Sequence, residues 1–377
     1  MIKKLKYIDK PLLVTTTLLF IIGLVMVFSA SNVTAYMSQA VSPYNYFIRQ
    51  AAFLVVGIIL FIIMIPFNTY VYGKVARPLL LINVVALVVL LIYGSAKNQA
   101  ISWFDLGFIS IQPSEFVKVI TIVFLADYYE IHKKKLNGWI ATLYPIGICV
   151  AIAALIFIQP DLGTTVIYST IIAIIFFSVP ISKEIKYKIS FIAIGIIFLS
   201  IFAIFGLGKK ILEERQLERF DISNPCEKIL STGNQICNCY IAINNGGLTG
   251  VGLGNSTQKY LYLPEPYTDF IFAIIVEELG VITGVGILLL YLIVLFRILL
   301  IGRKSPTNRG AILCYGIAAY IFLHITVNLL GIMGLIPMTG VPLPFMSYGG
   351  SYTICLIAAL TIVQRVNIDT GLYNEKK

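Results

Sequence analysis

The sequence predicts an all-α integral membrane protein of ten transmembrane helices, and three observations support this prediction. Apolar residues make up 58% of the 377 positions and charged residues only 12%. The mean hydropathy is +0.90, which soluble domains do not reach. A helix that crosses a hydrocarbon core of about 30 Å needs roughly 20 mostly apolar residues. Stretches of this kind recur at 11–30, 48–66, 77–95, 112–130, 138–158, 162–180, 189–207, 269–300, 309–330 and 350–366.

Basic residues gather in alternate loops between these stretches, at 74–77, 133–135, 183–188 and 303–309. Because Lys and Arg concentrate in cytoplasmic loops, both termini are expected in the cytoplasm. The first stretch follows a basic start and is too long for a cleaved signal peptide, so it is expected to be a retained signal anchor. The net charge of +10 is spread along the chain instead of lying on one face, which argues against nucleic acid binding.

Two loops on the outer side differ from the short connections elsewhere. Residues 208–268 form a long polar stretch, and their apolar, Gly-rich second half argues against simple disorder. Residues 331–350 are rich in Gly and Pro, which predicts a re-entrant or wedged segment. Irregular backbone at membrane depth needs protein or a wet cavity around it. The whole chain, 1–377, is therefore expected to form one membrane domain with a long extracytoplasmic loop.

The six cysteines show no metal-binding spacing, and three of them lie inside apolar spans, where they act as small hydrophobes. The other three, Cys226, Cys237 and Cys239, share the long loop. A disulfide from Cys226 to one of its neighbours is possible in an oxidising compartment. The odd number of thiols nevertheless favours free cysteines.

Ionisable side chains inside a membrane span are costly unless they are paired or functional. Glu115 and Lys118, in QPSEFVK, are three residues apart and therefore share one face of a helix. Two interpretations remain open. The two residues form a self-satisfying ion pair, or they face a polar cavity and take part in function.

Three further acids lie at or inside the spans. Asp161 follows Pro160 where a helix begins, so capping of free backbone amides is its expected role. Glu277 and Glu278 are adjacent in a helix and project about 100° apart, so they cannot share one partner. At least one of them is expected to face the interior of the bundle.

Asp269 stands in LPEPYTDFIFAIIVEELG, where the long outer loop meets the next span. One interpretation is a helix cap formed together with Thr268. The other is a partly desolvated carboxylate whose pKa rises toward that of a general base. His132, beside cytoplasmic lysines, and His324, inside a span, are not placed to serve instead. The chain has no GxSxG, HExxH or P-loop motif for acyl transfer, zinc hydrolysis or nucleotide hydrolysis.

Four blocks of sequence resemble the SEDS family, which contains FtsW, RodA and SpoVE. The longest is GGLTGVGLGNSTQKYLYLPEPYTDFIFAIIVEELG at 246–280. The others are SWFDLGFISIQPSEFVK at 102–118, QPDLGTT at 159–165 and PMTGVPLPFMSYGGS at 337–351. Their order and spacing match the family over essentially the whole chain, and the NST, QK and YLPE runs favour the FtsW-like branch.

The resemblance implies a peptidoglycan glycosyltransferase of the bacterial cytoplasmic membrane. Such an enzyme polymerises lipid II on the outer face, in cell division or cell-shape maintenance, with a class B penicillin-binding protein as partner. The family's essential carboxylate matches Asp269, its Arg before Gln matches Arg49, and QPSExxK matches Glu115 and Lys118. Further candidate substrate-binding residues in the matching blocks are Gln258, Lys259 and Glu265.

One departure from the family concerns cations for the substrate diphosphate. Ser102 and Ser110 stand where many relatives have arginines. Arg49, Lys118, Lys259 or a divalent cation, Mg²⁺ or Mn²⁺, would then have to balance the diphosphate charge.

The resulting hypothesis makes Asp269 the base that takes the proton of the acceptor hydroxyl, while Arg49 and Lys118 stabilise the departing diphosphate. Glu115 orients Lys118. Two alternatives from other classes stay open: a lipid II flippase, and a scaffold for a class B penicillin-binding protein. A flippase would carry its charges near the bilayer midplane, whereas these four residues fall in the outer third.

Overall fold

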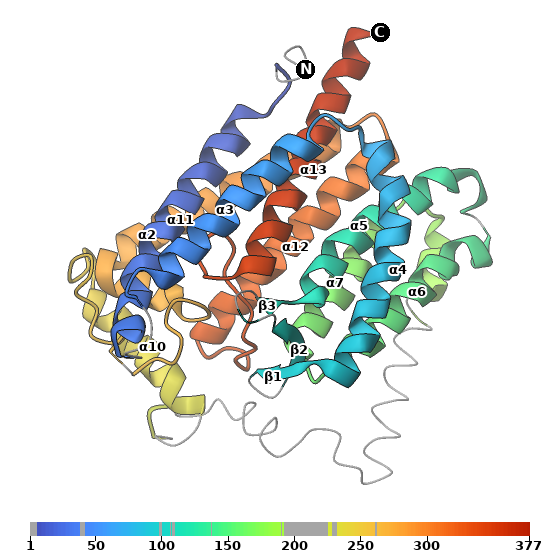
Figure 1. Cartoon of the computed structure of the whole chain (residues 1–377). Helices are drawn as coiled ribbons and strands as arrows, with labels where there is room; N and C mark the ends of the chain where they lie inside the picture. Colours follow the sequence, from blue (N-terminus) through green and yellow to red (C-terminus); the bar gives the residue numbers. More distant parts are fainter. Residues whose placement is uncertain are drawn as a thin grey trace.

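The computed structural model describes residues 6–37, 42–97, 100–105, 107, 110–136, 138–189, 191, 225–227, 232–260 and 262–377. These residues form a bundle of long helices with a small sheet at one end (Figure 1). The helices are α2 (Lys10–Met37), α3 (Asn45–Met64), α4 (Thr69–Tyr93), α5 (Pro113–Ile131), α6 (Trp139–Ile158), α7 (Leu162–Ser178), α10 (Thr232–Gly246), α11 (Ile271–Lys304), α12 (Asn308–Ile332) and α13 (Gly350–Glu375). Two short 3₁₀ turns lie at Lys133–Lys135 and Pro225–Glu227.

Nine of the ten predicted spans coincide with helices of the structure, and the tenth, 189–207, lies outside the described residues apart from 189 and 191. Seven described helices are long and apolar enough to cross a membrane: α2, α3, α4, α6, α11, α12 and α13. Helix α7 is apolar but has only 17 residues. Helix α5 carries Glu115, Lys118 and Asp127, all buried among neighbouring helices. The protein is therefore an all-helical membrane protein.

Helices α12 and α13 form the centre of the bundle (Figure 1). In the apolar 18-residue stretch of α13, 83% of the residues are buried within the protein, whereas in that of α3 only 11% are buried. The outer face of α3 exposes branched aliphatic side chains, including Val55, Ile58 and Ile62. Such a face suits contact with lipid. The polar residues that carry chemistry are thus expected on α12, α13 and the segments packed against them.

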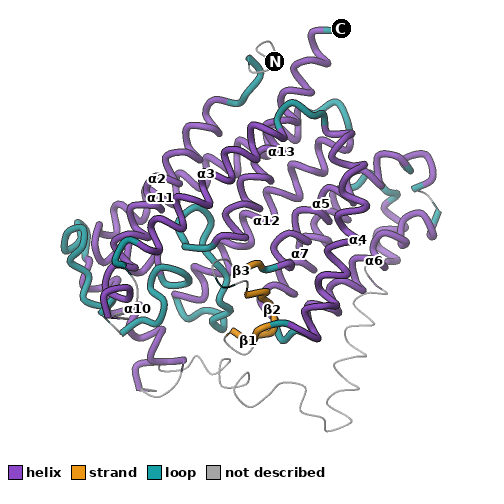
Figure 2. Tube along the Cα trace, in the orientation of Figure 1, coloured by secondary structure: helices purple, strands orange, loops and turns teal. Residues whose placement is uncertain are grey.

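A short antiparallel sheet joins α4 to α5 and was not anticipated from the sequence. Its strands are β1 (Ser95–Lys97), β2 (Ala100–Asp105) and β3 (Ser110–Ile111), in the order β1-β2-β3. Figure 2 shows them at the end of the bundle that also holds α10, away from the two termini. The all-α prediction missed them because strands of two to six residues carry too few positions for a visible alternation.

The Gly- and Pro-rich segment between α12 and α13 has irregular backbone but is buried among helices. Leu343 and Met346 are fully buried, and the ring of Phe345 lies 4.9 Å from that of Phe20 in α2, centroid to centroid. The hydroxyl of Tyr291 in α11 donates to the carbonyl of Pro344. The segment is wedged between helices, as its composition predicted.

Helix α11 is broken at Gly280, where φ is 82° and ψ is 165°. The carbonyls of Glu277 and Glu278 before the break accept hydrogen bonds of 2.9 Å from the N–H groups of Val251 and Gly252. The first two amides after the break, at 281 and 282, donate to the loop carbonyls 247 and 248 at 2.9 and 3.2 Å. The second half of the long loop therefore replaces a helical turn and is fixed to the bundle.

The first half of the long loop contains a disulfide between Cys226 and Cys237, whose Cα atoms are 4.9 Å apart. The prediction of free thiols was therefore wrong for this pair. Helix α10 places Cys237 on the face that meets Pro225–Glu227, whereas Cys239, two positions on, is buried and free. Spacing alone could not choose between the two, because the choice depends on the orientation of α10.

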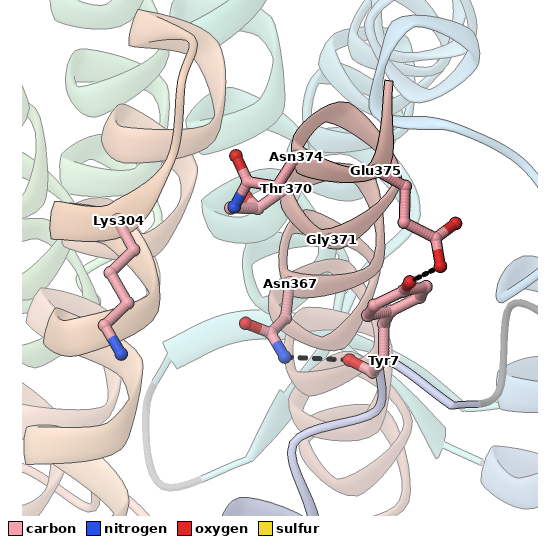
Figure 3. A pocket seen from close by; sticks show the side chains of 7 residues that line it. All are labelled: Tyr7, Lys304, Asn367, Thr370, Gly371, Asn374 and Glu375. Atoms are coloured by element: carbon pink, nitrogen blue, oxygen red, sulfur yellow. Dashed lines mark hydrogen bonds between the residues drawn. The ribbon is translucent and has the colours of Figure 1, made fainter. Parts of the chain in front are cut away.

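The two termini meet at the end of the bundle opposite the sheet (Figure 1). The amide of Asp9 donates to the side chain of Gln364 at 2.8 Å, and that side chain donates back to the Asp9 carbonyl at 3.0 Å. The carboxylate of Asp9 also pairs with Arg297 in α11. Nearby, a cavity of about 570 Å³ is lined by Tyr7, Lys304, Asn367, Thr370, Gly371, Asn374 and Glu375 (Figure 3).

The Gly280→Ala substitution should destabilise the protein, because the added Cβ would lie 2.2 Å from the carbonyl oxygen of Leu248. The strained backbone alone costs about 1–3 kcal/mol, and the contact adds to this. Thermal unfolding of the detergent-purified protein measures the effect. The matched control is Gly286→Ala on the same helix, where a Cβ meets nothing within 4 Å. Equal melting temperatures for the two variants would contradict this account of the break.

Candidate active site

Asp269 lies in the turn that leads into α11 and does not cap that helix. The N-cap position is Phe270, and no side chain accepts from the free amides there. The helix-cap interpretation is therefore wrong. Asp269 is half-buried, and burial raises its pKa to about 7, with a further contribution from the negative charge of Glu265. None of the described residues donates a hydrogen bond to its carboxylate, which leaves both oxygens available.

Arg49 reaches the same region from the N-terminal end of α3. Its guanidinium lies close to the hydroxyl of Tyr348, and its side chain is exposed. The ring of Tyr348 lies 5.8 Å from that of Tyr267, two residues before Asp269, and Tyr46 packs against both rings at 5.3 and 4.4 Å. A cluster of three aromatic rings thus joins the Arg49 helix to the Asp269 turn.

Glu115 and Lys118 form a buried ion pair, with Lys118 Nζ 2.8 Å from Glu115 Oε1. The pairing interpretation is confirmed, and both side chains are at most 3% exposed. Lys118 Nζ also lies 2.9 Å from His324 Nε2. Since an ammonium group only donates, Nε2 accepts and Nδ1 carries the proton. That proton points to the carbonyl of Pro342, 3.4 Å away.

His324 is the residue that sequence reasoning missed, having set it aside as a histidine inside a span. It is fully buried in α12 and stacks on Tyr352 of α13 at 4.7 Å between ring centroids. It joins the Glu115–Lys118 pair to the Gly- and Pro-rich segment. The spacing to QPSEFVK, more than 200 positions, gives no sequence signal for this contact.

The three candidates of the long loop have different surroundings. Lys259 is buried and pairs with Glu278 at 2.8 Å, while its ammonium also donates to the carbonyl of Gly254. It therefore neutralises a buried acid, and its role in substrate binding stays a prediction. Gln258 is also buried, and its Oε1 has no partner among the described residues. Glu265 is exposed and lies close enough to Asp269 to raise its pKa.

The adjacent acids of α11 both face protein, each toward its own partners. Glu277 accepts from the hydroxyls of Ser256 and Thr257, and Glu278 accepts from Ser29 of α2 as well as from Lys259. Both carboxylates are completely buried. Adjacent side chains of a helix project about 100° apart. Glu277 therefore binds the loop, whereas Glu278 joins the loop to α2.

Asp161 accepts from the amide of Thr164 at 3.0 Å as the N-cap of α7, so its predicted capping role is confirmed.

The structure thus divides the predicted residues into three groups. The first group, Asp269, Glu265 and Arg49, lies around the cluster of three tyrosine rings. The second, Glu115 and Lys118, lies behind the Gly- and Pro-rich segment. The third, Gln258 and Lys259, belongs to the part of the long loop that binds Glu277 and Glu278. Over the ranges that the structure describes, no group of three or more His, Cys, Asp or Glu side chains is arranged to hold a metal ion.

The chain is similar to known proteins over almost its entire length. The family of cell cycle proteins FtsW, RodA and SpoVE matches residues 10–371. The probable peptidoglycan glycosyltransferase FtsW of Bacillus subtilis is 37% identical over 380 residues, which cover 100% of this chain and 94% of the relative. The stage V sporulation protein E of the same organism is 37% identical over 364 residues, covering 95% and 96%.

Solved structures share the fold. A chain from work on the structural coordination of polymerization and crosslinking by a peptidoglycan synthase complex superimposes with a TM-score of 0.76 at 23% identity, covering 96% of this chain and 98% of that one. The rod shape determining protein RodA of Thermus thermophilus gives a TM-score of 0.66 at 22% identity, covering 96% and 97%. With a matched region that leaves out only the two ends, the chain belongs to the FtsW/RodA/SpoVE family of cell cycle proteins.

Proposed function

We propose that this protein is a peptidoglycan glycosyltransferase that polymerises lipid II into glycan strands. Relatives that match it along its full length are named as such enzymes. The observation that carries the proposal is a half-buried carboxylate, Asp269, with a pKa of about 7 and no hydrogen-bond donor of its own among the described residues. A general base works best when its pKa lies near the operating pH.

Asp269 takes the proton of the acceptor sugar hydroxyl as that oxygen bonds to the anomeric carbon of the donor sugar. The bond from this carbon to the undecaprenyl diphosphate breaks, and its electron pair leaves with the diphosphate. A single in-line displacement of this kind inverts the anomeric carbon. Arg49 binds the diphosphate in this proposal, which its exposed side chain beside Tyr348 supports. Lys118 is held by Glu115 and His324, so its contribution is a positive charge from within the bundle.

The proposed topology has ten transmembrane helices, with both termini in the cytoplasm and the long loop outside. It counts the seven long apolar helices, α5, α7 and the span predicted at 189–207. Two observations support it. The termini share one end of the bundle (Figure 1), and the disulfide of the long loop belongs in an oxidising compartment.

The proposed partner is a class B penicillin-binding protein, whose transpeptidase would cross-link the strands. The similar solved chain comes from a synthase complex in which polymerization and crosslinking are coordinated. Cell division is the proposed setting, because FtsW proteins recur among the matching relatives.

The Asp269→Asn variant should lose at least about 10²-fold of the polymerisation rate, because an amide cannot accept the proton. The assay reconstitutes the purified protein, alone and with a class B penicillin-binding protein, and follows labelled lipid II. The matched control is Asp161→Asn, which makes the same change in a helix cap where Asn serves equally well. Polymer from Asp269→Asn would remove this residue from the role. Translocation of lipid II without polymer would identify a flippase.

The polymerisation rate should depend on pH with a midpoint near 7. The ionised carboxylate is the active form, so kcat/KM rises with pH through the pKa of Asp269 and falls about tenfold per unit below it. Glu265→Gln should move the midpoint to lower pH, because the negative charge of Glu265 helps to raise this pKa. Rate profiles of the two proteins test this. An unchanged midpoint in Glu265→Gln would contradict the coupling.

Labelling of spheroplasts with an impermeant maleimide should detect Cys226 and Cys237 only after an impermeant reductant opens their disulfide. A cysteine introduced as Lys134→Cys, in the exposed turn between α5 and α6, should react only after lysis. Reaction of this cysteine in intact spheroplasts would reverse the proposed orientation.

A further inference from the structure

Asn328, on α12, contacts the Asp269 turn through its side-chain amide. The amide nitrogen donates to the carbonyl oxygen of Asp269 and to that of Val341, each at 2.9 Å. Asn328 is only 6% exposed. A primary amide carries two protons, so both are used, one on each segment. One side chain thus joins the turn that bears the acid to the Gly- and Pro-rich segment.

The same segment holds the two carbonyls that precede Asp269. The hydroxyl of Ser347 donates to the carbonyl of Thr268 at 2.6 Å, and the amide of Tyr348 donates to the carbonyl of Tyr267 at 2.9 Å. Three successive carbonyls are therefore bound from outside their own segment. Backbone held at each residue in this way has little freedom to rotate.

This anchoring matters because the carboxylate of Asp269 receives no hydrogen bond from any described residue. Its direction is set by its backbone and by the walls around it. One wall is Gly340, where an added Cβ would lie 3.5 Å from Asp269 Oδ2. The next residue, Val341, is the second acceptor of Asn328. The side-chain amide of Asn328 therefore fixes both the turn that bears Asp269 and the backbone at Gly340 and Val341 that shields its carboxylate from water.

A second side chain on the same face of α12 contacts the Gly- and Pro-rich segment next to Val341. His324, one turn before Asn328, directs Nδ1 to the carbonyl of Pro342 at 3.4 Å and contacts Lys118 through Nε2. Charged and titratable groups of the described residues lie on three sides of Asp269. Glu265 is on its own turn, and Arg49 and three tyrosines form the aromatic cluster. His324 and the Glu115–Lys118 pair lie behind the segment.

We propose that Asn328 is a positioning residue for the reaction, holding the Asp269 turn against the segment at 340–348 so that the carboxylate stays shielded and directed at the acceptor. This inference rests on the proposed function. Ser347 assists it through the neighbouring carbonyl. Neither residue touches the reacting atoms, so both act through the geometry of Asp269.

The test compares pH–rate profiles of lipid II polymerisation for Asn328→Leu and Ser347→Ala. Removal of the anchor lets water reach the carboxylate, so its pKa falls toward the ordinary value of 3.8. We expect kcat to fall at least about tenfold, because small displacements of a catalytic group are costly. The midpoint of the profile should move down by about one pH unit. A purely structural role would lower the amount of folded enzyme and leave the midpoint unchanged.

The control is Asn308→Leu, the same substitution in the first turn of α12, about 30 Å away along the helix. It should keep both kcat and the midpoint. If Asn328→Leu does not fold, Ser347→Ala decides, since it removes only one hydroxyl. Wild-type midpoints in the folded variants would overturn the inference while the proposed function stands. Failure of the proposed function is separate, because it would show as polymer made by Asp269→Asn.

Discussion

The structure depends on the rule that a polar group inside a membrane bundle must find its partner in the protein. Glu277 and Glu278 follow this rule, and their partners lie in the long loop. Their carboxylates and carbonyls accept from the long loop, and the break at Gly280 makes the carbonyls available. A loop that would otherwise extend into water is thereby bound to α11, and its last residues deliver Asp269 to the mouth of the bundle. The buried carboxylates of Glu277 and Glu278 thus fix the loop that carries the half-buried Asp269.

The site itself combines two kinds of environment. Asp269 and Arg49 remain open to ligand, whereas Glu115, Lys118 and His324 are buried, with Lys118 in contact with both of the others. Between them runs the segment at 340–348, which contacts both groups. Polar residues of the inner group therefore shape the segment that faces the reactive acid. A substitution in the inner group can alter the reaction without meeting the substrate.

Much of this arrangement could be predicted from sequence, because hydrophobic length alone marks membrane helices and the bends between them carry Gly and Pro. The cap at Asp161, the pair of Glu115 with Lys118 and the position of Asp269 followed from local spacing. The remainder depends on contacts between distant segments. His324 meets Lys118 across 206 positions, and Asn328 meets Asp269 across 59. The Lys259–Glu278 pair and the choice of Cys237 over Cys239 depend in the same way on how α10 and α11 are turned.

The mutual hydrogen bonds between Asp9 and Gln364 have a consequence for biogenesis. These residues are 355 positions apart, so the first helix is made long before its partner on the last one. Until α13 leaves the ribosome, the amide of Asp9 lacks this acceptor, whereas its carboxylate can already pair with Arg297 of α11. The contact between the two ends of the chain therefore forms only when synthesis is nearly complete.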